Sequence, residues 1–205
     1  FLDARCRELA ATGAMLADAG LRVRTVYFGG GTPTTLSAPQ LDRLMGELAD
    51  HIDLSGCTEY TVEAGRPDTI TAEKLAVLAR RGCSRVSVNP QTMQDAVLER
   101  MGRAHRADDI LRAYALARES GIGCINMDLI AGLPGDSAEG FRASLEQVLD
   151  LGPENVTGLP ADGGGGRPAL RRGGGGYAGF RPGRPAGGRA EALLPLPPEV
   201  HVRLL

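Results

Sequence analysis

The sequence predicts an α/β fold that forms part of an opened β/α barrel, with about four parallel strands inside and helices outside. Two observations predict this fold class. From residue 1 to residue 152, short strands alternate with helical segments of about 10 to 15 residues, and parallel neighbouring strands need a crossover long enough to hold a helix. Three of the expected strands also carry polar side chains on one face and apolar side chains on the other.

This alternation favours a barrel over a doubly wound sheet. Successive residues of a strand point to opposite faces, so one face carries three polar pairs: Thr61 with Glu63, Ser87 with Asn89, and Asn126 with Asp128. The other face carries Tyr60, Val62, Val86, Val88, Ile125, Met127 and Leu129. A doubly wound sheet is covered by helices on both faces and would be apolar on both. A polar lumen inside an incomplete barrel fits the pattern better.

The first half of the chain is expected to begin with a helix over 4–19 and a strand over 22–28 (RVRTVYF). Ser37 begins the next helix, because Gln40 three residues later completes a capping-box spacing. The apolar residues of that helix recur at helical spacing: Leu41, Leu44, Met45 and Leu48. A second strand over 59–64 (EYTVEA) follows.

A helix over 71–81 then ends at Gly82, a residue type that suits the left-handed position after a helix. The third strand covers 85–89 (RVSVN). A short helix near 93–100 precedes a longer one over 107–120, which Gly121 ends in the same way.

The fourth strand covers 124–130 (CINMDLI). Asp136 and Glu139 are expected to cap the helix that follows it. The apolar stripe of that helix consists of Phe141, Leu145, Val148 and Leu149.

The composition changes at Gly158. Residues 158–205 contain 13 Gly and 7 Pro, with GGGG at 163–166 and again at 173–176. Ordering each glycine costs about 0.5–1 kcal/mol more than ordering alanine, so the sum approaches the net stability of a whole domain. We therefore expect a Gly/Pro/Arg-rich disordered tail over 158–205 and a folded part over 1–157. A Gly/Arg segment for RNA is the alternative, but RGG triplets do not repeat here.

The overall composition excludes several function classes. A formal net charge of −2 gives no electrostatic footprint for nucleic acid or for an anionic membrane. No stretch reaches the roughly 20 apolar residues of a membrane span, and the first residues lack a signal-peptide pattern. We expect a cytoplasmic protein without nucleic-acid or membrane partners.

The four cysteines are far apart in the sequence and show no CxxC or CxxxCxxC spacing. They are Cys6, Cys57, Cys83 and Cys124. This spacing predicts neither a metal site nor a redox pair, and a disulfide framework is not expected. Most of them are expected to be buried as small hydrophobic side chains.

The stretch VYFGGGTPTT places Gly29, Gly30 and Gly31 directly after the first strand. Glycine has no Cβ and adopts positive φ without strain, so these residues can present backbone N–H and C=O groups to a ligand. Pro33 then removes one N–H and biases Thr32 toward an extended conformation. A loose loop is the alternative interpretation.

Polar side chains follow the later strands at the edge where β/α barrels carry their chemistry. Glu63 ends the second strand, Gln91 follows the third, Asp128 lies in the fourth, and Arg103 lies on the loop after the short helix. Together these groups suit a zwitterionic amino-acid ligand. Glu63 would bind the ammonium group, Arg103 the carboxylate, and Asp128 a sugar hydroxyl.

Each of these side chains also has a structural interpretation. Glu63 could form a plain ion pair with Arg66, and Arg103 could be a solvated charge at a helix end. His105 is expected to be such a solvated charge, and no function is assigned to it. Asp128 has the strongest claim to a function, because an inward carboxylate is costly unless it is paired or bound.

Four motifs occur in order, namely VYFGGGTPTTL, TVEAGRPD, NPQTM and INMDLIAGLPG. Over residues 20–157 the chain resembles the radical S-adenosylmethionine (SAM) enzymes of the oxygen-independent coproporphyrinogen III oxidase family. It is similar to the branch called coproporphyrinogen dehydrogenase, HemZ type. The resemblance implies that Gly29, Gly30 and Gly31 contact the methionine moiety of SAM, with Thr32 beside them. It also implies that SAM contacts Glu63, Gln91, Arg103 and Asp128.

The chain departs from the family pattern at two places. The family binds a [4Fe-4S] cluster through a CxxxCxxC loop, and that segment would lie before Phe1. A further barrel strand is expected near ENVT (154–157), but the sequence continues as GLPADGGGG. We therefore expect a truncated fragment whose end is out of register with the family.

The resemblance implies a reaction that the fragment alone would not perform. The family cleaves SAM with one electron from the cluster, which an electron donor supplies, and the 5′-deoxyadenosyl radical then abstracts hydrogen from a propionate of coproporphyrinogen III. Decarboxylation leaves a vinyl group, a step of anaerobic heme biosynthesis. A heme-binding chaperone with the same barrel is the alternative from another class. A generic phosphate-binding barrel enzyme is a third, and it would need a second glycine-rich loop near the end of the domain.

Overall fold

The computed structural model of the chain describes residues 1–161 and 199–204. Within the segment 158–205, which was expected to be a disordered tail, residues 162–198 and 205 lie outside the described residues. The boundary at residue 157 therefore stays a prediction.

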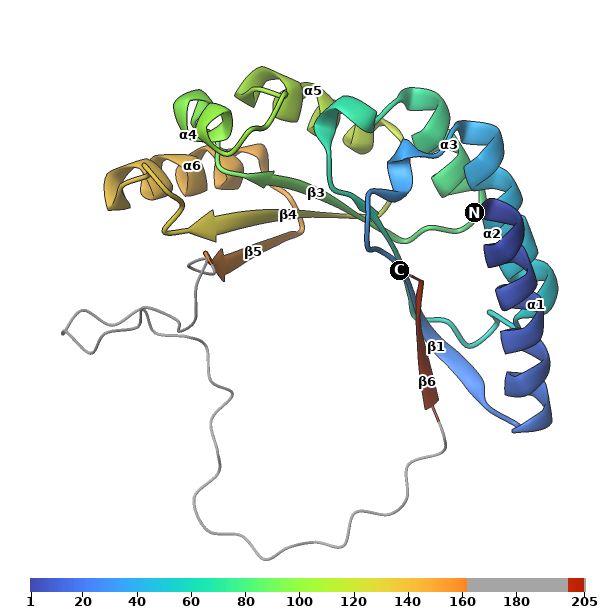
Figure 1. Cartoon of the computed structure of the whole chain (residues 1–205). Coiled ribbons are helices and arrows are strands. Elements are labelled where there is room, and N and C mark those ends of the chain that lie inside the picture. The colour runs from blue at the N-terminus through green and yellow to red at the C-terminus, as the bar shows by residue number, and fades with distance from the viewer. Residues whose placement is uncertain (162–198, 205) are drawn as a thin grey trace, which may run out of the picture. The chain divides into compact units, whose positions relative to one another are not determined.

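The centre of the fold is a sheet of parallel strands that curls toward one side (Figure 1). Its strands are β1 (Arg22–Phe28), β2 (Glu59–Ala64), β3 (Arg85–Gln91), β4 (Cys124–Ala131) and β5 (Asn155–Pro160). They pair in chain order, β1 with β2 and so on to β5. The predicted α/β fold, an opened barrel with helices outside, is confirmed.

Two strands extend the sheet beyond the roughly four that the alternation predicts. β5 pairs with β4 from Asn155 to Pro160, where a further strand was expected near 154–157, and β6 (Glu199–Leu204) pairs with β1 at the other edge. Both strands contain residues of the segment that was expected to lack regular structure. Pro160 is compatible with β5 because the strand lies at an edge, where a missing N–H breaks no ladder.

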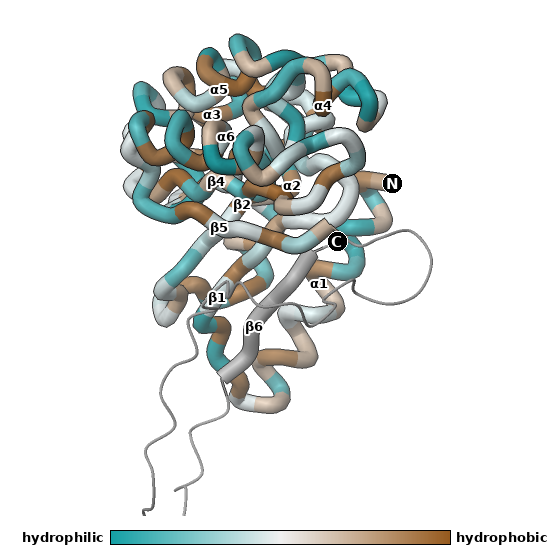
Figure 2. The backbone as a smooth tube through the Cα atoms, turned by 90° about the vertical axis from the view of Figure 1, so that its left-hand side faces the viewer, coloured by the Kyte–Doolittle hydropathy of each residue, from teal (hydrophilic) through white to brown (hydrophobic). Residues whose placement is uncertain are grey.

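The six α-helices of the described residues lie on the outer face of the curled sheet (Figure 1). They are α1 (Leu2–Asp18), α2 (Ala38–His51), α3 (Ala72–Arg80), α4 (Asp95–Arg100), α5 (Ala107–Glu119) and α6 (Ala138–Leu151). Two short 3-10 helices, η1 (Pro33–Thr35) and η2 (Pro67–Thr69), follow β1 and β2. Hydrophobic and hydrophilic residues alternate along the helices in Figure 2, as the helical spacing of their apolar residues requires. Within residues 1–161 and 199–204, none of the helices is both long and apolar enough to cross a bilayer.

The core lies between the helices and the apolar face of the sheet. The residues expected on that face are buried, among them Val62, Val86, Ile125 and Met127 at 0% exposure. The predicted stripe of α2 is also buried, and Ser37 and Gln40 form the predicted capping box. The polar strand face is therefore left on the inner side of the curl.

The start and the stripe of α6 differ from the prediction. The N-cap is Ser137, whose Oγ accepts a hydrogen bond from the Gly140 N–H at 3.0 Å. Asp136 lies one residue earlier and accepts from the Ser137 N–H instead. Leu149 is 56% exposed, because its neighbour Val148 takes the position that faces the core.

All four cysteines are free thiols, and only two of them are buried although most were expected to be. Cys6 and Cys83 are buried in the core, whereas Cys57 and Cys124 are half-buried.

Candidate functional site

A cavity of about 440 Å³ opens at the carboxyl ends of β1, β2 and β3. Six of the eight predicted site residues line it: Gly30, Gly31, Thr32, Glu63, Gln91 and Arg103. The lining also includes Thr35, Gly65, Arg66 and Asn89. Parallel strands end at the same edge of a sheet, so residues far apart in the sequence meet there. Gly29 and Asp128 lie outside this lining.

The loop after β1 requires glycine at two of its positions. Gly30 has φ 97°, in the left-handed region that side chains rarely adopt. A Cβ on Gly29 would collide with the ring of Tyr27 and would lie 3.1 Å from Oε2 of Glu63. The backbone at Gly29 therefore lies close to the carboxylate of Glu63. A loose loop would not need glycine for such a close approach.

The carboxylate of Glu63 is held by a neighbouring strand. Its Oε1 accepts a hydrogen bond from Nδ2 of Asn89 on β3 at 3.1 Å. None of the ion pairs found within residues 1–161 and 199–204 joins Glu63 to Arg66. Glu63 is a half-buried residue of the cavity lining and can accept hydrogen bonds from a cationic ligand group.

Gln91 and Arg103 form another part of the lining. Gln91 has φ 65°, and it is the only described residue other than glycine with a positive φ. Such a conformation costs energy, and it commonly marks a functional site. Arg103 donates from Nη2 to Oε1 of Gln91 at 2.8 Å, so the half-buried guanidinium is not a solvated charge at a helix end. Its remaining N–H groups can bind a carboxylate.

His105 differs from the prediction of a solvated charge. Its side chain is only 4% exposed, and Nε2 has no hydrogen-bond partner among the described residues. The chain leaves α4 through a left-handed turn at Gly102, φ 70°, and the imidazole three residues later is turned inward. Burial lowers the pKa of His105, and the nearby charge of Arg103 lowers it further.

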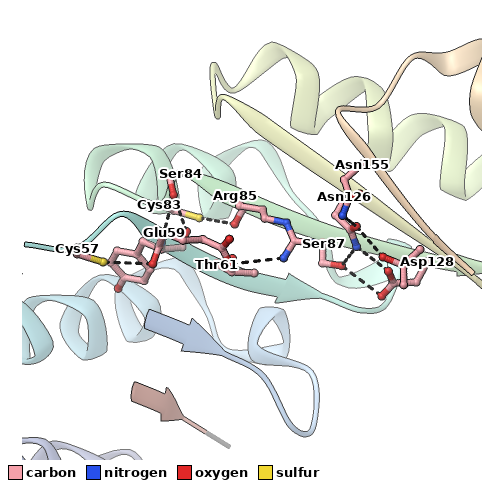
Figure 3. Close-up of polar contacts among 12 residues, drawn as sticks. Cys57, Glu59, Thr61, Cys83, Ser84, Arg85, Ser87, Asn126, Asp128 and Asn155 are labelled. Atoms are coloured by element: carbon pink, nitrogen blue, oxygen red, sulfur yellow. Dashed lines mark hydrogen bonds and ion pairs between the residues drawn. The ribbon is translucent and has the colours of Figure 1, made fainter. Parts of the chain in front are cut away.

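Asp128 lies in a hydrogen-bonded network on the inner face of the sheet (Figure 3). Its Oδ1 accepts from Nδ2 of Asn126 at 2.6 Å, and its Oδ2 lies 3.4 Å from Oγ of Ser87. Asn126 also donates to Ser87 at 2.7 Å, and its Oδ1 accepts from Asn155 and Thr157 on β5.

The network reaches the cavity through β3. Ser87 donates to Oδ1 of Asn89 at 2.8 Å, and Asn89 donates to Glu63. Asp128 and Glu63 are therefore linked across three strands, although only Glu63 lines the cavity.

Sequence reasoning missed part of the cavity wall. The strand alternation places Asn89 on the polar face, which is a signal that it points toward the same side as Glu63. The sequence suggests Arg66 only as a possible ion-pair partner of Glu63. Nothing in the sequence marks Thr35 or Gly65 as wall residues.

The residues at the cavity suit an amino acid such as the methionine moiety of SAM. An acid, a guanidinium and a free glycine backbone edge can bind an ammonium and a carboxylate group. A [4Fe-4S] cluster does not fit the described residues. Within 1–161 and 199–204, no group of three His, Cys, Asp or Glu side chains is placed to hold a metal.

Comparisons with known proteins agree on one family. The profile of the radical SAM superfamily matches residues 7–148. An oxygen-independent coproporphyrinogen-III oxidase-like protein HemZ of Bacillus subtilis is 44% identical over 151 residues, which cover 73% of this chain and 30% of that protein. Heme chaperone HemW of the same organism is 37% identical over 158 residues, which cover 77% of this chain and 41% of that protein.

Among solved structures, coproporphyrinogen III oxidase (HemN) from Escherichia coli, a radical SAM enzyme, matches with a TM-score of 0.70 and 30% identity. The match covers 78% of this chain and 36% of that one. The chain therefore spans less than half the length of each of these relatives.

Proposed function

The chain belongs to the radical SAM superfamily, and we propose on that basis that the cavity beside Gly30 binds the amino-acid moiety of SAM. The observation that carries this proposal is the meeting of Gly30, Glu63 and Arg103 around one cavity. Gly30 follows β1, Glu63 lies in β2 and Arg103 follows α4, and only the parallel sheet brings them together.

The residues would act as follows. Glu63 accepts hydrogen bonds from the ammonium group, and Arg103, held by Gln91, binds the carboxylate in bidentate geometry. Gly29, Gly30, Gly31 and Thr32 present their backbone groups to the methionine moiety. Asp128 binds a ribose hydroxyl from its place in the Asn126 network.

For the whole protein we propose an oxidative decarboxylation of coproporphyrinogen III propionates to vinyl groups. The support is the 44% identity to the HemZ protein, whose name describes it as coproporphyrinogen-III oxidase-like. In the whole protein a [4Fe-4S] cluster and an external electron donor would supply reducing power, and none of the described residues of this chain would hold the cluster. The residues of this chain would hold SAM in place and keep its charged groups paired.

SAM binding is tested by isothermal titration calorimetry on the full-length protein with its cluster, with a Glu63→Gln variant. Loss of a charge-assisted contact is expected to weaken SAM binding about tenfold or more. The matched control is Glu59→Gln on the same strand, because Glu59 lies at the amino end of β2 and pairs with Arg85. Equal SAM affinity in Glu63→Gln and wild type would overturn the assignment.

A heme chaperone is the second candidate function, and the 37% identity to HemW favours it. The two functions differ in what the whole protein does with a tetrapyrrole. Release of CO2 from coproporphyrinogen III in the presence of SAM and a reductant supports the oxidase. A saturable Soret shift on titration with heme, without CO2 release, supports the chaperone.

A further inference from the structure

The hydrogen bonds on the inner face of the sheet all run in one direction, from β5 toward the cavity (Figure 3). They begin at Asn155 and Thr157, which both donate to Oδ1 of Asn126. Because its oxygen is occupied on that side, Asn126 turns Nδ2 the other way and donates to Ser87 at 2.7 Å and to Asp128 at 2.6 Å. The contacts with β5 therefore fix the orientation of the Asn126 amide.

Ser87 passes this direction on to Asn89. A hydroxyl group carries one hydrogen, and Oγ of Ser87 lies 2.8 Å from Oδ1 of Asn89 but 3.4 Å from Oδ2 of Asp128. The hydrogen therefore goes to Asn89, while the same Oγ accepts from Asn126. With Oδ1 of Asn89 turned to Ser87, the amide presents Nδ2 to Glu63, 3.1 Å from Oε1. The opposite orientation would place an amide oxygen against the carboxylate.

Burial keeps this arrangement in a single state. Ser87, Asn89 and Asn126 are all buried, so water does not replace a partner that turns away. A buried polar group without a partner is costly, and hydrogen bonds in such surroundings strengthen one another. The three side chains therefore hold the Asn89 amide with its donor toward Glu63.

Asn89 divides the two oxygens of Glu63 between different neighbours. Oε1 accepts the hydrogen bond from Asn89, and Oε2 lies beside the loop after β1, 3.1 Å from the point that a Cβ on Gly29 would occupy. Oε2 is thus the oxygen that faces the glycine backbone. Since Asn89 turns its acceptor to Ser87, the carboxylate of Glu63 is the group that attracts a cation at this place.

We propose that Asn89 is a positioning residue for the ammonium group of SAM, an inference that rests on the proposed function of the cavity. Asn89 acts through Glu63: it holds Oε1, so that Oε2 stays directed at the ammonium group. Ser87 and Asn126 act one and two steps further away, because they keep the Asn89 amide in the orientation that this contact requires. The polar inner face of the strands thereby connects β5 to the SAM site.

The test measures how strongly the protein prefers SAM over an analogue in which hydrogen replaces the α-ammonium group. Isothermal titration calorimetry on the full-length protein with its cluster gives both dissociation constants for each variant. Their ratio reports the ammonium contact, and a lowered fraction of folded protein cancels from it. We expect Asn89→Ala to reduce the ratio about fivefold, because the carboxylate of Glu63 is then no longer held.

Three further variants separate positioning from a general loss of structure. Asn89→Ala combined with Glu63→Gln should have the same ratio as Glu63→Gln alone, because Asn89 acts through Glu63. Ser87→Ala should give an intermediate reduction, since the Asn89 amide is then free to turn. The matched control is Ser84→Ala, which removes a hydrogen bond to Tyr60 between β2 and the start of β3, outside the cavity lining. Its ratio should equal that of wild type.

The outcomes distinguish this inference from the proposed function. An unchanged ratio in Asn89→Ala, or a ratio in the double variant below that of Glu63→Gln, overturns the positioning role, and a wild-type ratio in Ser87→Ala overturns the part of Ser87. The SAM site itself stands in these cases if Glu63→Gln still lowers the ratio. Equal binding of SAM and the analogue by wild type overturns both the ammonium assignment and the role of Asn89.

Discussion

Arg103 donates from Nη2 to Oε1 of Gln91 at 2.8 Å and so ties the loop after α4 to the end of β3. Gln91 offers this acceptor from a left-handed backbone conformation. The strained residue therefore positions a cation in the lining of the cavity.

Replacement of Gln91 should separate stability from ligand binding. Gln91→Gly removes the acceptor for Arg103 but suits φ 65°, so we expect equal or slightly greater stability together with weaker SAM binding. Thermal unfolding and calorimetric SAM titration measure the two effects. Gln91→Ala keeps the backbone strain of wild type and loses the hydrogen bond to Arg103, so that variant should lose stability as well as SAM affinity. A Gln91→Gly protein that binds SAM as wild type does would contradict the role of the Arg103 contact.

The two glycines at the cavity edge should differ in their tolerance of alanine. Gly30→Ala forces a side chain into φ 97°, and we expect a loss of about 1 kcal/mol or more in the free energy of unfolding. Gly31 has open space where a Cβ would lie and no positive φ, so Gly31→Ala is the matched control and should fold normally. Chemical denaturation of both variants checks this difference, which would vanish if the loop relaxed freely.

Asn126 should be a key residue for stability on the inner face of the sheet. Its side chain is 2% exposed and bonds to Ser87, Asp128, Asn155 and Thr157. Asn126→Ala leaves several of these groups without a partner and should lower the free energy of unfolding by about 2–3 kcal/mol or more. Asn155→Ala removes a single bond of the network and should cost less. Equal losses of unfolding free energy in Asn126→Ala and Asn155→Ala would show that Asn126 is not the central residue of this hydrogen-bonded network.

The cysteines should differ in reactivity. Burial raises the pKa of the Cys83 thiol to about 12, and its side chain is 5% exposed. We expect Cys83 to resist alkylation at neutral pH in the folded protein, while the half-buried Cys57 and Cys124 react faster. Mass spectrometry of peptides after timed iodoacetamide treatment measures the three rates. Rapid labelling of Cys83 under native conditions would be inconsistent with its position in the core.

An ion pair between α2 and α3 should make stability depend on pH in the acid range. Asp42 accepts from Arg81 Nε and Arg80 Nη2, each at 2.8 Å, and these contacts lower its pKa from 3.8 to about 2. A lowered pKa stabilises the folded protein above the unfolded value, and that contribution is lost as pH falls from about 4 through about 2. Asp42→Asn should be less stable than wild type at pH 6. The difference should shrink on acidification, as denaturant unfolding at several pH values will measure.

Periodicity in the sequence determined most of the local structure. The bounds of β1 and β2 and the capping box at Ser37 were predicted correctly, because hydrogen bonds and side-chain alternation within a few residues decide them. The polar inner face was also predictable from the sequence, because polar and apolar residues alternate within each strand. Similarity of the motifs to a known family was visible at the same level.

Only the tertiary structure decided which of these side chains meet. The register between β2 and β3 brings Asn89 to Glu63, and the path of the loop after α4 buries His105 beside the guanidinium of Arg103. The same packing leaves Asp128 in the Asn126 network instead of in the cavity lining. Such contacts join residues many positions apart, so they depend on strand pairing and burial across the whole sheet. A local pattern reports which face a side chain takes, but the packed sheet sets its distance to every partner on another strand.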